Sequence, residues 1–285
     1  MQVILTIAGS DSSAGAGIQA DLKAISACGG YGASVLTAVT AQNTRGVLDA
    51  FELPLEIITA QLEAVFGDLR VAAVKSGMLS SSRVVGLVEG ALRRWTPAHY
   101  VLDPVLVAKS GDALLDAQAV EMLRRRLVPL ATLVTPNRHE ALALTGVDVR
   151  GPEDAEKAGR VLLASGCGAV LVKGGHMDSG GATDVLVTAS GAEIFAARRI
   201  DTPHTHGTGC TYAAAVATYL GRGMLLADAV RAAKLYVTEA IRDGLALGGG
   251  RGPTDHFFYL RRPDPGQWIE RLQVRRAPGG SDHGS

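Results

Sequence analysis

The sequence predicts an α/β fold, a three-layer αβα sandwich with a mostly parallel central sheet. Short apolar runs rich in Val, Leu and Ala alternate with longer segments whose apolar residues recur at helical spacing. Runs of that composition are typical of strands buried on both faces. Strand–helix alternation predicts crossover connections between parallel strands, with helices on both sides of the sheet.

The predicted elements follow one another along almost the whole chain. Strands are expected at residues 3–8, 35–41, 72–76, 100–103, 132–135 and 169–173, and helices at 18–27, 55–66, 84–94, 120–127 and 153–163. Residues 184–188 and 193–197, separated by Ala-Ser-Gly, predict a hairpin. Two Ala-rich helices are expected near 208–220 and 226–243.

The chain has 285 residues, of which 47% are hydrophobic, so it can bury a large core. No linker or internal repeat divides it, and we expect one domain over residues 1–262. Residues 263–285 then form a C-terminal extension, whose polar, Gly-rich end (276–285) is expected to be disordered.

Charge and cysteine content exclude several classes of protein. Lys plus Arg and Asp plus Glu both number 28, so no basic excess favours a nucleic-acid partner. Three scattered cysteines predict neither a disulfide framework nor a structural zinc site. No apolar run approaches the roughly 20 residues that span a bilayer, and the first residues lack the basic start of a signal peptide. We therefore expect a cytoplasmic protein with no membrane partner.

The first glycine-rich turn follows the first predicted strand and leads into a helix. Gly15-x-Gly17-x-x-Ala20 fits a relaxed dinucleotide fingerprint, but the expected carboxylate at the end of the second strand is missing. A tight turn that merely requires small residues is one alternative. The other is a substrate pocket where Asp21 and Gln42 meet above the sheet.

Two acidic residues are expected at neighbouring strand ends. Asp103 ends a predicted apolar strand, where open α/β sheets bind ligands, and Glu140 follows the next strand. Together they suit Mg²⁺ on a triphosphate. A capped strand end at Asp103 and a helix-capping box between Asn137 and Glu140 remain the alternatives.

Two further segments suggest phosphate binding. Lys173 ends a buried strand, which is costly unless the ammonium meets an anion or reaches solvent. Gly207, Thr208 and Gly209 lead into an Ala-rich helix, so backbone N–H groups would face a phosphate. Cys210 in the first helical turn is either a thiolate favoured by the helix dipole or a small buried residue. The chain has no P-loop motif.

Seven segments taken in order resemble the ribokinase-like superfamily, and within it the hydroxymethylpyrimidine/phosphomethylpyrimidine kinases of thiamin synthesis. They are AGSDSSAGAGIQADLK (8–23), TAVTAQNT (37–44), KSGML (75–79), VLDPVLVAKSGD (101–112), TPNRHEA (135–141), VLVKGGH (170–176) and HGTGCT (206–211). The resemblance covers roughly residues 3–260. Ala14, where Gly is common, and His204, where Asn is common, depart from the family pattern.

The resemblance implies an enzyme that uses ATP and Mg²⁺ to phosphorylate 4-amino-5-hydroxymethyl-2-methylpyrimidine and then its monophosphate. For the substrate, it implies that Asp21 and Gln42 surround the pyrimidine and that Gly9 and Met78 line its pocket. For the nucleotide, it implies that Asp103 and Glu140 bind Mg²⁺, that Asn137, Lys173 and Thr208 bind ATP, and that Gly207, Thr208 and Gly209 form the anion hole with Lys173 beside it. Cys210 stands where many superfamily members place an Asp base. A homodimer is expected by analogy alone. Pyridoxal kinase, a sugar or nucleoside kinase, and a non-catalytic binding protein of the same fold stay open as alternatives.

Overall fold

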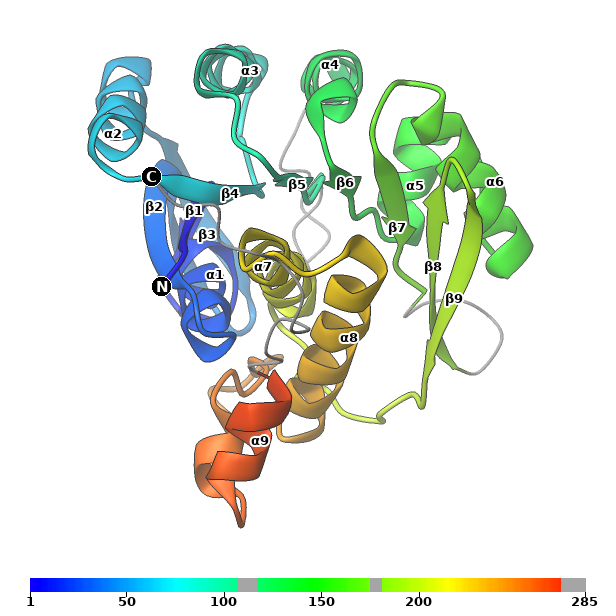
Figure 1. Ribbon diagram of the computed structural model, residues 1–285. Coiled ribbons are helices and arrows are strands. Elements are labelled where there is room, and N and C mark those ends of the chain that lie inside the picture. Colours follow the sequence, from blue (N-terminus) through cyan, green and yellow to red (C-terminus); the bar gives the residue numbers. More distant parts are fainter. Residues whose placement is uncertain (107–116, 175–180, 273–285) are drawn as a thin grey trace, which may run out of the picture.

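The structure is a computed structural model that describes residues 1–106, 117–174 and 181–272. Its centre is one nine-stranded sheet in the order β3-β2-β1-β4-β5-β6-β7-β8-β9 (Figure 1). The strands are β1 (Val3–Asp11), β2 (Tyr31–Asn43), β3 (Gly46–Glu52), β4 (Val71–Ser76), β5 (Tyr100–Leu102), β6 (Leu133–Val134), β7 (Ala169–Val172), β8 (Ala182–Thr188) and β9 (Gly191–Ala197).

The inner strands are parallel and the outer ones are antiparallel. β2, β1, β4, β5, β6 and β7 pair in parallel, whereas β3 pairs antiparallel with β2, and β8 pairs antiparallel with both β7 and β9. All the parallel strands therefore end at the same edge of the sheet. That edge is where open α/β sheets bind ligands.

Helices cover both faces of the sheet (Figure 1). One layer contains α2 (Leu55–Asp68), α3 (Ser82–Trp95), α4 (Ala117–Met122), α5 (Arg138–Thr145) and α6 (Pro152–Leu163). The other contains α1 (Gly17–Ala27), α7 (Thr208–Gly221) and α8 (Leu226–Arg242). Side chains on the two faces of the strands thus form two separate cores, one under each helical layer.

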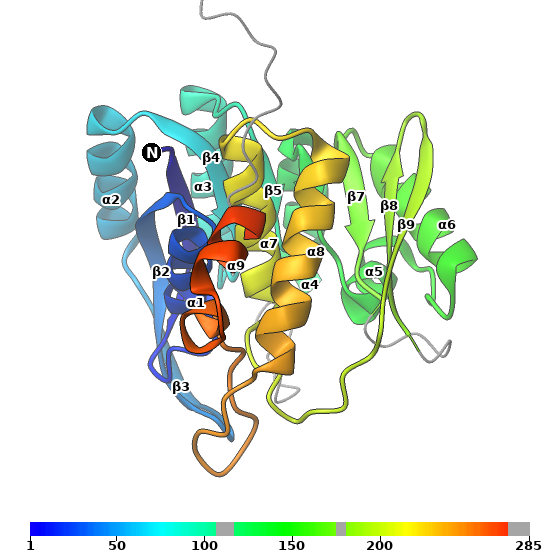
Figure 2. The ribbon, with the colours of Figure 1, turned by 60° about the horizontal axis from the view of Figure 1, so that its bottom comes forward.

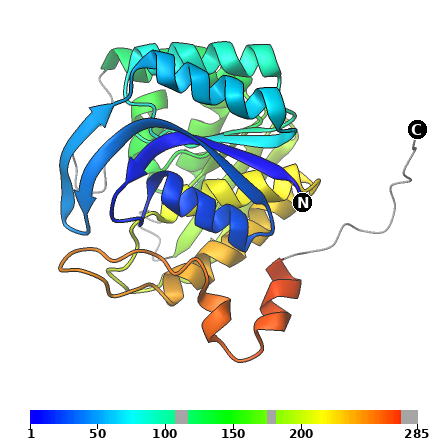
Figure 3. The ribbon, with the colours of Figure 1, turned by 90° about the vertical axis from the view of Figure 1, so that its left-hand side faces the viewer.

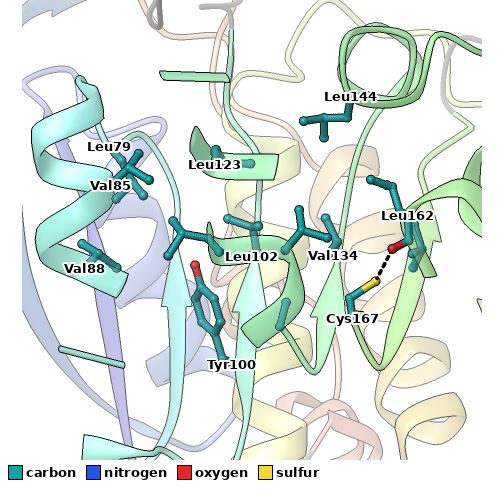
Figure 4. Close-up of a cluster of buried hydrophobic side chains, with 14 of the residues drawn as sticks. Leu79, Val85, Val88, Tyr100, Leu102, Leu123, Val134, Leu144, Leu162 and Cys167 are labelled. Carbon is teal, nitrogen blue, oxygen red and sulfur yellow. Dashed lines mark hydrogen bonds between the residues drawn. The ribbon is translucent and has the colours of Figure 1, made fainter. Parts of the chain in front are cut away.

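The core beneath α2–α6 is apolar almost throughout. Leu102 and Val134 of neighbouring strands lie between Val85 of α3 and Leu162 of α6 (Figure 4), and all four are fully buried. The polar groups in it are paired: the Tyr100 hydroxyl and the Ser76 hydroxyl are 2.6 Å apart. Each strand presents alternate residues to the two cores, which explains the continuous apolar runs.

The predicted strands, the hairpin and the two late helices are confirmed, with bounds shifted by a few residues. The helix expected at 120–127 is instead α4 followed by a π-helical turn, Leu123–Leu127, and a 3₁₀ turn, Val128–Leu130. β3 was not predicted, because its residues are mostly exposed and lack apolar alternation. The disorder expected for residues 276–285 falls outside the described residues.

The chain after α8 contains structure that the sequence did not predict. A helical turn, Phe258–Arg261, and α9 (Pro265–Leu272) pack on the core beneath α1, α7 and α8 through Phe258, Trp268 and Leu272 (Figure 2). The loop before them runs beside the β2–β3 hairpin (Figure 3), where Arg251 N–H donates to the Thr44 carbonyl at 2.8 Å. Within the described ranges, no helix is both long and apolar enough to cross a membrane.

Candidate active site

A cavity of about 1320 Å³ lies at the carboxyl edge of the parallel strands. Eleven of the twelve predicted site residues line it, although the sequence places them on segments far apart. They are Gly9, Gln42, Met78, Asp103, Asn137, Glu140, Lys173, Gly207, Thr208, Gly209 and Cys210. The fold brings them together because they lie near the carboxyl ends of β1 and β2, follow β4, β5, β6 and β7, or stand at the start of α7.

Asp21 is the exception, and the expectation that it surrounds the pyrimidine is corrected here. The residue lies on α1, is fully buried, and does not line the cavity. Its Oδ2 atom accepts hydrogen bonds from Thr6 Oγ1 at 2.6 Å and Lys75 Nζ at 2.8 Å. The Asp21 carboxylate, which the sequence suggested would contact the substrate, is therefore paired with Lys75 inside the protein.

The turn at the start of α7 has the geometry of an anion site. Gly207 precedes the helix with φ +76°, and a Cβ atom there would overlap the carbonyl oxygen of Gly15. Only glycine fits a left-handed backbone packed that closely. The first N–H groups of α7 have no carbonyl partners within the helix, and they lie at the positive end of its dipole. Thr208, Gly209 and Cys210, which supply these groups, all line the cavity. The Thr208 N–H also donates to the Thr205 carbonyl before the helix at 3.3 Å.

Charged side chains converge beneath that turn. Lys173 Nζ lies 2.8 Å from Asp103 Oδ1 and 4.0 Å from Glu140 Oε2. A Cβ atom on Gly209 would stand 3.3 Å from Lys173 Nζ and 3.9 Å from Asp103 Oδ2. One ammonium and two carboxylates thus adjoin the N-terminus of α7, which suits a phosphate accompanied by a cation.

The two carboxyl groups respond differently to these surroundings. Burial acts to raise the pKa of Asp103, but Lys173 and Lys75 outweigh it and leave that pKa lowered. Burial raises the pKa of Glu140 to about 7, and the charge of Asp103 adds to that rise. Asp103 is therefore ionised at neutral pH, whereas Glu140 is close to half-protonated.

The donor set fits Mg²⁺. Magnesium prefers hard oxygen ligands and is usually held by one or two carboxylates together with substrate phosphates and waters. Asp103 and Glu140 provide two carboxylates, and the described residues contain no cluster of three or more His, Cys, Asp or Glu side chains that would form a closed metal site. The arrangement suits a cation that arrives with a nucleotide.

Asn137 and Glu140 form the capping box expected as the alternative reading of this segment. Asn137 Oδ1 accepts the Glu140 N–H at 3.0 Å, and Glu140 Oε2 accepts the Asn137 N–H at 2.7 Å. Glu140 Oε1 has no such role in the cap. The capping role is thus confirmed, while contact of Asn137 with ATP stays a prediction.

The surroundings of Cys210 favour its thiol over the thiolate that the start of the helix suggested. Burial raises its pKa to about 11, and Asp21 and Asp103 add to that effect. The charge of Lys75 and the backbone N–H of Gly17 act in the opposite direction without overcoming it. The helix N-terminus alone, on which the sequence argument rested, is therefore not sufficient to ionise the thiol.

Two polar side-chain pairs at the cavity wall were not predicted from the sequence. Asp11 at the end of β1 contacts His206 Nε2 at 2.8 Å, and Lys234 of α8 contacts Asp184 of β8 at 2.7 Å. Asp184 also accepts the N–H of Gly174, next to Lys173, at 2.9 Å. Asp11 could have been predicted as a site residue, because it ends a strand just as Asp103 does. The pairing of either acidic residue could not, because each partner is distant in the sequence.

Comparison with known proteins gives consistent matches over most of the chain. A family model described as phosphomethylpyrimidine kinase matches residues 11–255. A hydroxymethylpyrimidine/phosphomethylpyrimidine kinase from Streptomyces coelicolor is 53% identical over 258 residues, which cover 90% of this chain and 95% of the relative.

Two solved structures share the fold. A phosphomethylpyrimidine kinase from Clostridium difficile is 44% identical with a TM-score of 0.76, over 85% of this chain and 100% of that one. A Bacillus subtilis pyridoxal kinase, solved as an ADP complex, is 37% identical with a TM-score of 0.86, over 92% of this chain and 99% of that one. The predicted fold class is confirmed by the sheet and by these neighbours.

Proposed function

Because the chain belongs to the phosphomethylpyrimidine kinase family, we propose that it phosphorylates 4-amino-5-hydroxymethyl-2-methylpyrimidine and then the resulting monophosphate. The chain is a kinase of thiamin biosynthesis, as its relatives' names indicate, and it uses ATP. The observation that carries the assignment is the convergence of Lys173 and Asp103 on the Gly207–Gly209 turn. A binding protein without catalysis has no need for that arrangement.

The first phosphorylation joins the hydroxymethyl oxygen to the γ-phosphorus of ATP. The bond between that phosphorus and the β–γ bridging oxygen breaks, and ADP departs with the electron pair. The N–H groups of the Gly207–Gly209 turn and the Lys173 ammonium stabilise the charge on the transferred group. In phosphoryl transfer, positioning and electrostatic stabilisation of this kind supply most of the catalysis.

The proton of the hydroxymethyl group needs an acceptor, and Cys210 is the candidate. Its position at the N-terminus of α7 keeps it beside the transferred group. As a thiol it cannot accept a proton, so this role requires the minor thiolate form, which Lys75 favours. The second acceptor is a phosphate oxygen that is already ionised, so the second step needs no base.

Asp103 and Glu140 would hold Mg²⁺ in this scheme. The ion would neutralise phosphate charge when bound. Until then Asp103 is paired with Lys173, and Lys173 keeps its own charge because Asp103 and Glu140 offset the cost of its burial and raise its pKa. The acceptor would lie among Gly9, Gln42 and Met78, which line the same cavity.

Pyridoxal is the second candidate acceptor, because the Bacillus subtilis pyridoxal kinase superimposes with a higher TM-score than the Clostridium difficile enzyme. A competition experiment separates the two. Purified protein with ATP and Mg²⁺ would be assayed for kcat/KM on hydroxymethylpyrimidine, its monophosphate and pyridoxal. We expect both pyrimidines to turn over and pyridoxal to lag by more than about tenfold, or about 1.4 kcal/mol.

The opposite result would reassign the acceptor. If pyridoxal is preferred and the pyrimidine monophosphate is inert, the enzyme serves vitamin B6 salvage. Tight ligand binding without turnover of any acceptor would instead favour the non-catalytic alternative. A homodimer and a cytoplasmic location remain predictions, and light scattering on the purified protein tests the first.

A further inference from the structure

We propose that His206, held by Asp11 in one tautomer, is a positioning residue that aligns the anion-hole turn with the acceptor side of the cavity. The inference deepens the proposed function and rests on it. Asp11 and His206 are 195 residues apart along the chain, and their contact holds the end of β1 against the residue that precedes the anion-hole turn.

The carboxylate of Asp11 is saturated with donors. Its Oδ1 atom accepts Ser13 N–H at 2.8 Å and Ser13 Oγ at 2.7 Å, and its Oδ2 atom accepts Ala16 N–H at 2.8 Å. His206 Nε2 lies 2.8 Å from the same Oδ2. These bonds lower the pKa of Asp11 to about 2 against the opposing effect of burial, so the group is a carboxylate, which only accepts hydrogen bonds.

That chemistry determines the tautomer of His206. A carboxylate has no proton to give, so the hydrogen of the 2.8 Å contact belongs to Nε2. The imidazole is 10% exposed, and Gly15 packs on it so closely that a Cβ at that position would overlap Cδ2. The ring therefore cannot turn without displacing the loop that connects β1 to α1.

The same ring nitrogen lies beside Gln42. The Gln42 amide group lies 3.4 Å from His206 Nε2, and with its nitrogen on that side two donors would face each other. With the amide exchanged, the oxygen faces Nε2–H and the nitrogen faces Thr40 Oγ1 at 3.1 Å. That hydroxyl already donates to the Ser10 carbonyl at 2.8 Å, so it is free to accept. The network thus fixes which end of the Gln42 amide adjoins the acceptor site.

The backbone of His206 is fixed as well. Its N–H donates to the Gly252 carbonyl at 3.0 Å, and its carbonyl accepts the Thr254 N–H at 3.3 Å. The next residue is Gly207, which begins the anion-hole turn and packs against Gly15 of the Asp11 loop. A shift of His206 would therefore move the turn and Gln42 together. Misplacement of reacting groups by about 1 Å costs on the order of 100-fold in rate.

Three variants test the role. His206→Leu removes the donor, whereas His206→Gln keeps an amide N–H at about the same reach as Nε2. Asp11→Asn replaces one acceptor oxygen by an NH₂ group that would face Nε2–H and Ala16 N–H. We expect His206→Leu and Asp11→Asn to lower kcat/KM for hydroxymethylpyrimidine by about 100-fold. His206→Gln should recover at least about tenfold of that loss, and the KM for ATP should change least.

Histidine nitrogen NMR gives a readout that does not depend on activity. The chain has seven His residues, and the His206 signals are those that disappear in His206→Gln. We expect the Nε2–H tautomer in the wild-type protein without ligands and its loss in Asp11→Asn. An Nδ1–H tautomer in the wild type, or His206→Leu activity within threefold of wild type, would overturn the proposal. If the wild-type protein phosphorylates no acceptor, the proposed function is wrong instead. The tautomer of His206 would still test its contact with Asp11.

Discussion

The ammonium of Lys75 and the carboxylate of Asp21 form an ion pair at 2.8 Å in which both side chains are completely buried. Among the described residues, Asp21 Oδ1 has no hydrogen-bond partner, and a Cβ on Gly77 would stand 2.8 Å from Lys75 Nζ. Burial raises the pKa of Asp21, against the opposing effect of Lys75. Each charge is therefore tolerated in the core only because the other is present.

Lys75→Met should destabilise the protein by about 3–5 kcal/mol, because it leaves an uncompensated carboxylate in the core. Urea unfolding at neutral pH measures the effect. The double variant Lys75→Met/Asp21→Leu should regain most of that loss, since an apolar pair of similar volume replaces a buried ion pair at little cost.

The matched control is Arg83→Met. Arg83 pairs with Glu52 at 3.3 Å, but its side chain is 72% exposed, and exposed pairs contribute about 0–1 kcal/mol. Similar losses for Lys75→Met and Arg83→Met would show that burial of the Lys75 pair has no energetic consequence and would contradict the prediction.

This pair also shows where prediction from sequence failed. The strand–helix alternation was sufficient for the sheet and both helical layers, because period and composition are local properties. Asp21 looked like a pocket residue, since it follows a glycine-rich turn at a helix start. Its true partner, Lys75, is 54 residues away on β4. No local pattern reveals such a pairing.

The same limit applies elsewhere. Strand ends marked Asp103, Glu140 and Lys173 as one site, because parallel strands must end at one edge. β3 has mostly exposed residues and α9 has few buried ones, so neither shows the apolar pattern that identifies an element. The pKa of Cys210 depends first on its burial and then on carboxylates brought near by the fold, which a helix-terminus argument does not include.

The Cys210 thiol predicts a difference between the two phosphorylations. With its pKa raised to about 11, the thiolate fraction grows about tenfold per pH unit below that value. If the thiolate accepts the hydroxymethyl proton, kcat/KM for the first step should rise between pH 7 and 9. The second step should stay flat there, because its phosphate acceptor has a second pKa of about 6.

Cys210→Ala should abolish the pH rise and impair the first step more than the second. Cys167→Ala is the matched control, since Cys167 is a buried thiol with a pKa also raised to about 11. It is bonded to the Leu162 carbonyl at 3.4 Å (Figure 4) and is not among the residues that line the cavity. Its pH profile should match the wild type. Equal losses in both steps for Cys210→Ala would leave Cys210 as a packing residue.

Glu140 predicts a pH-dependent loss of stability in the protein without ligands. Its folded-state pKa is raised from 4.5 to about 7, so the folded state holds a proton that the unfolded state has released. Stability is then full below about pH 4.5 and falls as pH rises through about 7. Glu140→Gln removes this titration, keeps an oxygen for the helix cap, and should stabilise the protein at pH 8 by about 2–3 kcal/mol.

Urea unfolding at pH 5 and pH 8 measures that difference, which should nearly vanish at pH 5. The control is Glu153→Gln, an exposed acidic residue in the first turn of α6, where we expect little change at either pH. With ATP and Mg²⁺ added, Glu140→Gln should gain less stability than the wild type. Equal ligand-induced stabilisation would argue against a metal role for Glu140.

Gly207→Ala tests the anion-hole turn against a glycine of the same conformation. Gly207 has φ +76° and Gly146, at the end of α5, has φ +75°. A Cβ on Gly146 meets none of the described residues within 4 Å, whereas one on Gly207 would collide with the Gly15 carbonyl. Gly146→Ala should therefore cost only about 1–2 kcal/mol of stability for the left-handed backbone and leave kcat unchanged. Gly207→Ala must also displace the turn, so kcat should fall by about 100-fold or more, as when an oxyanion-hole donor is lost.

Thermal unfolding and steady-state kinetics on both variants separate the two effects. If Gly207→Ala retains kcat at the level of Gly146→Ala, the N–H groups of this turn do not stabilise the transferred phosphoryl group.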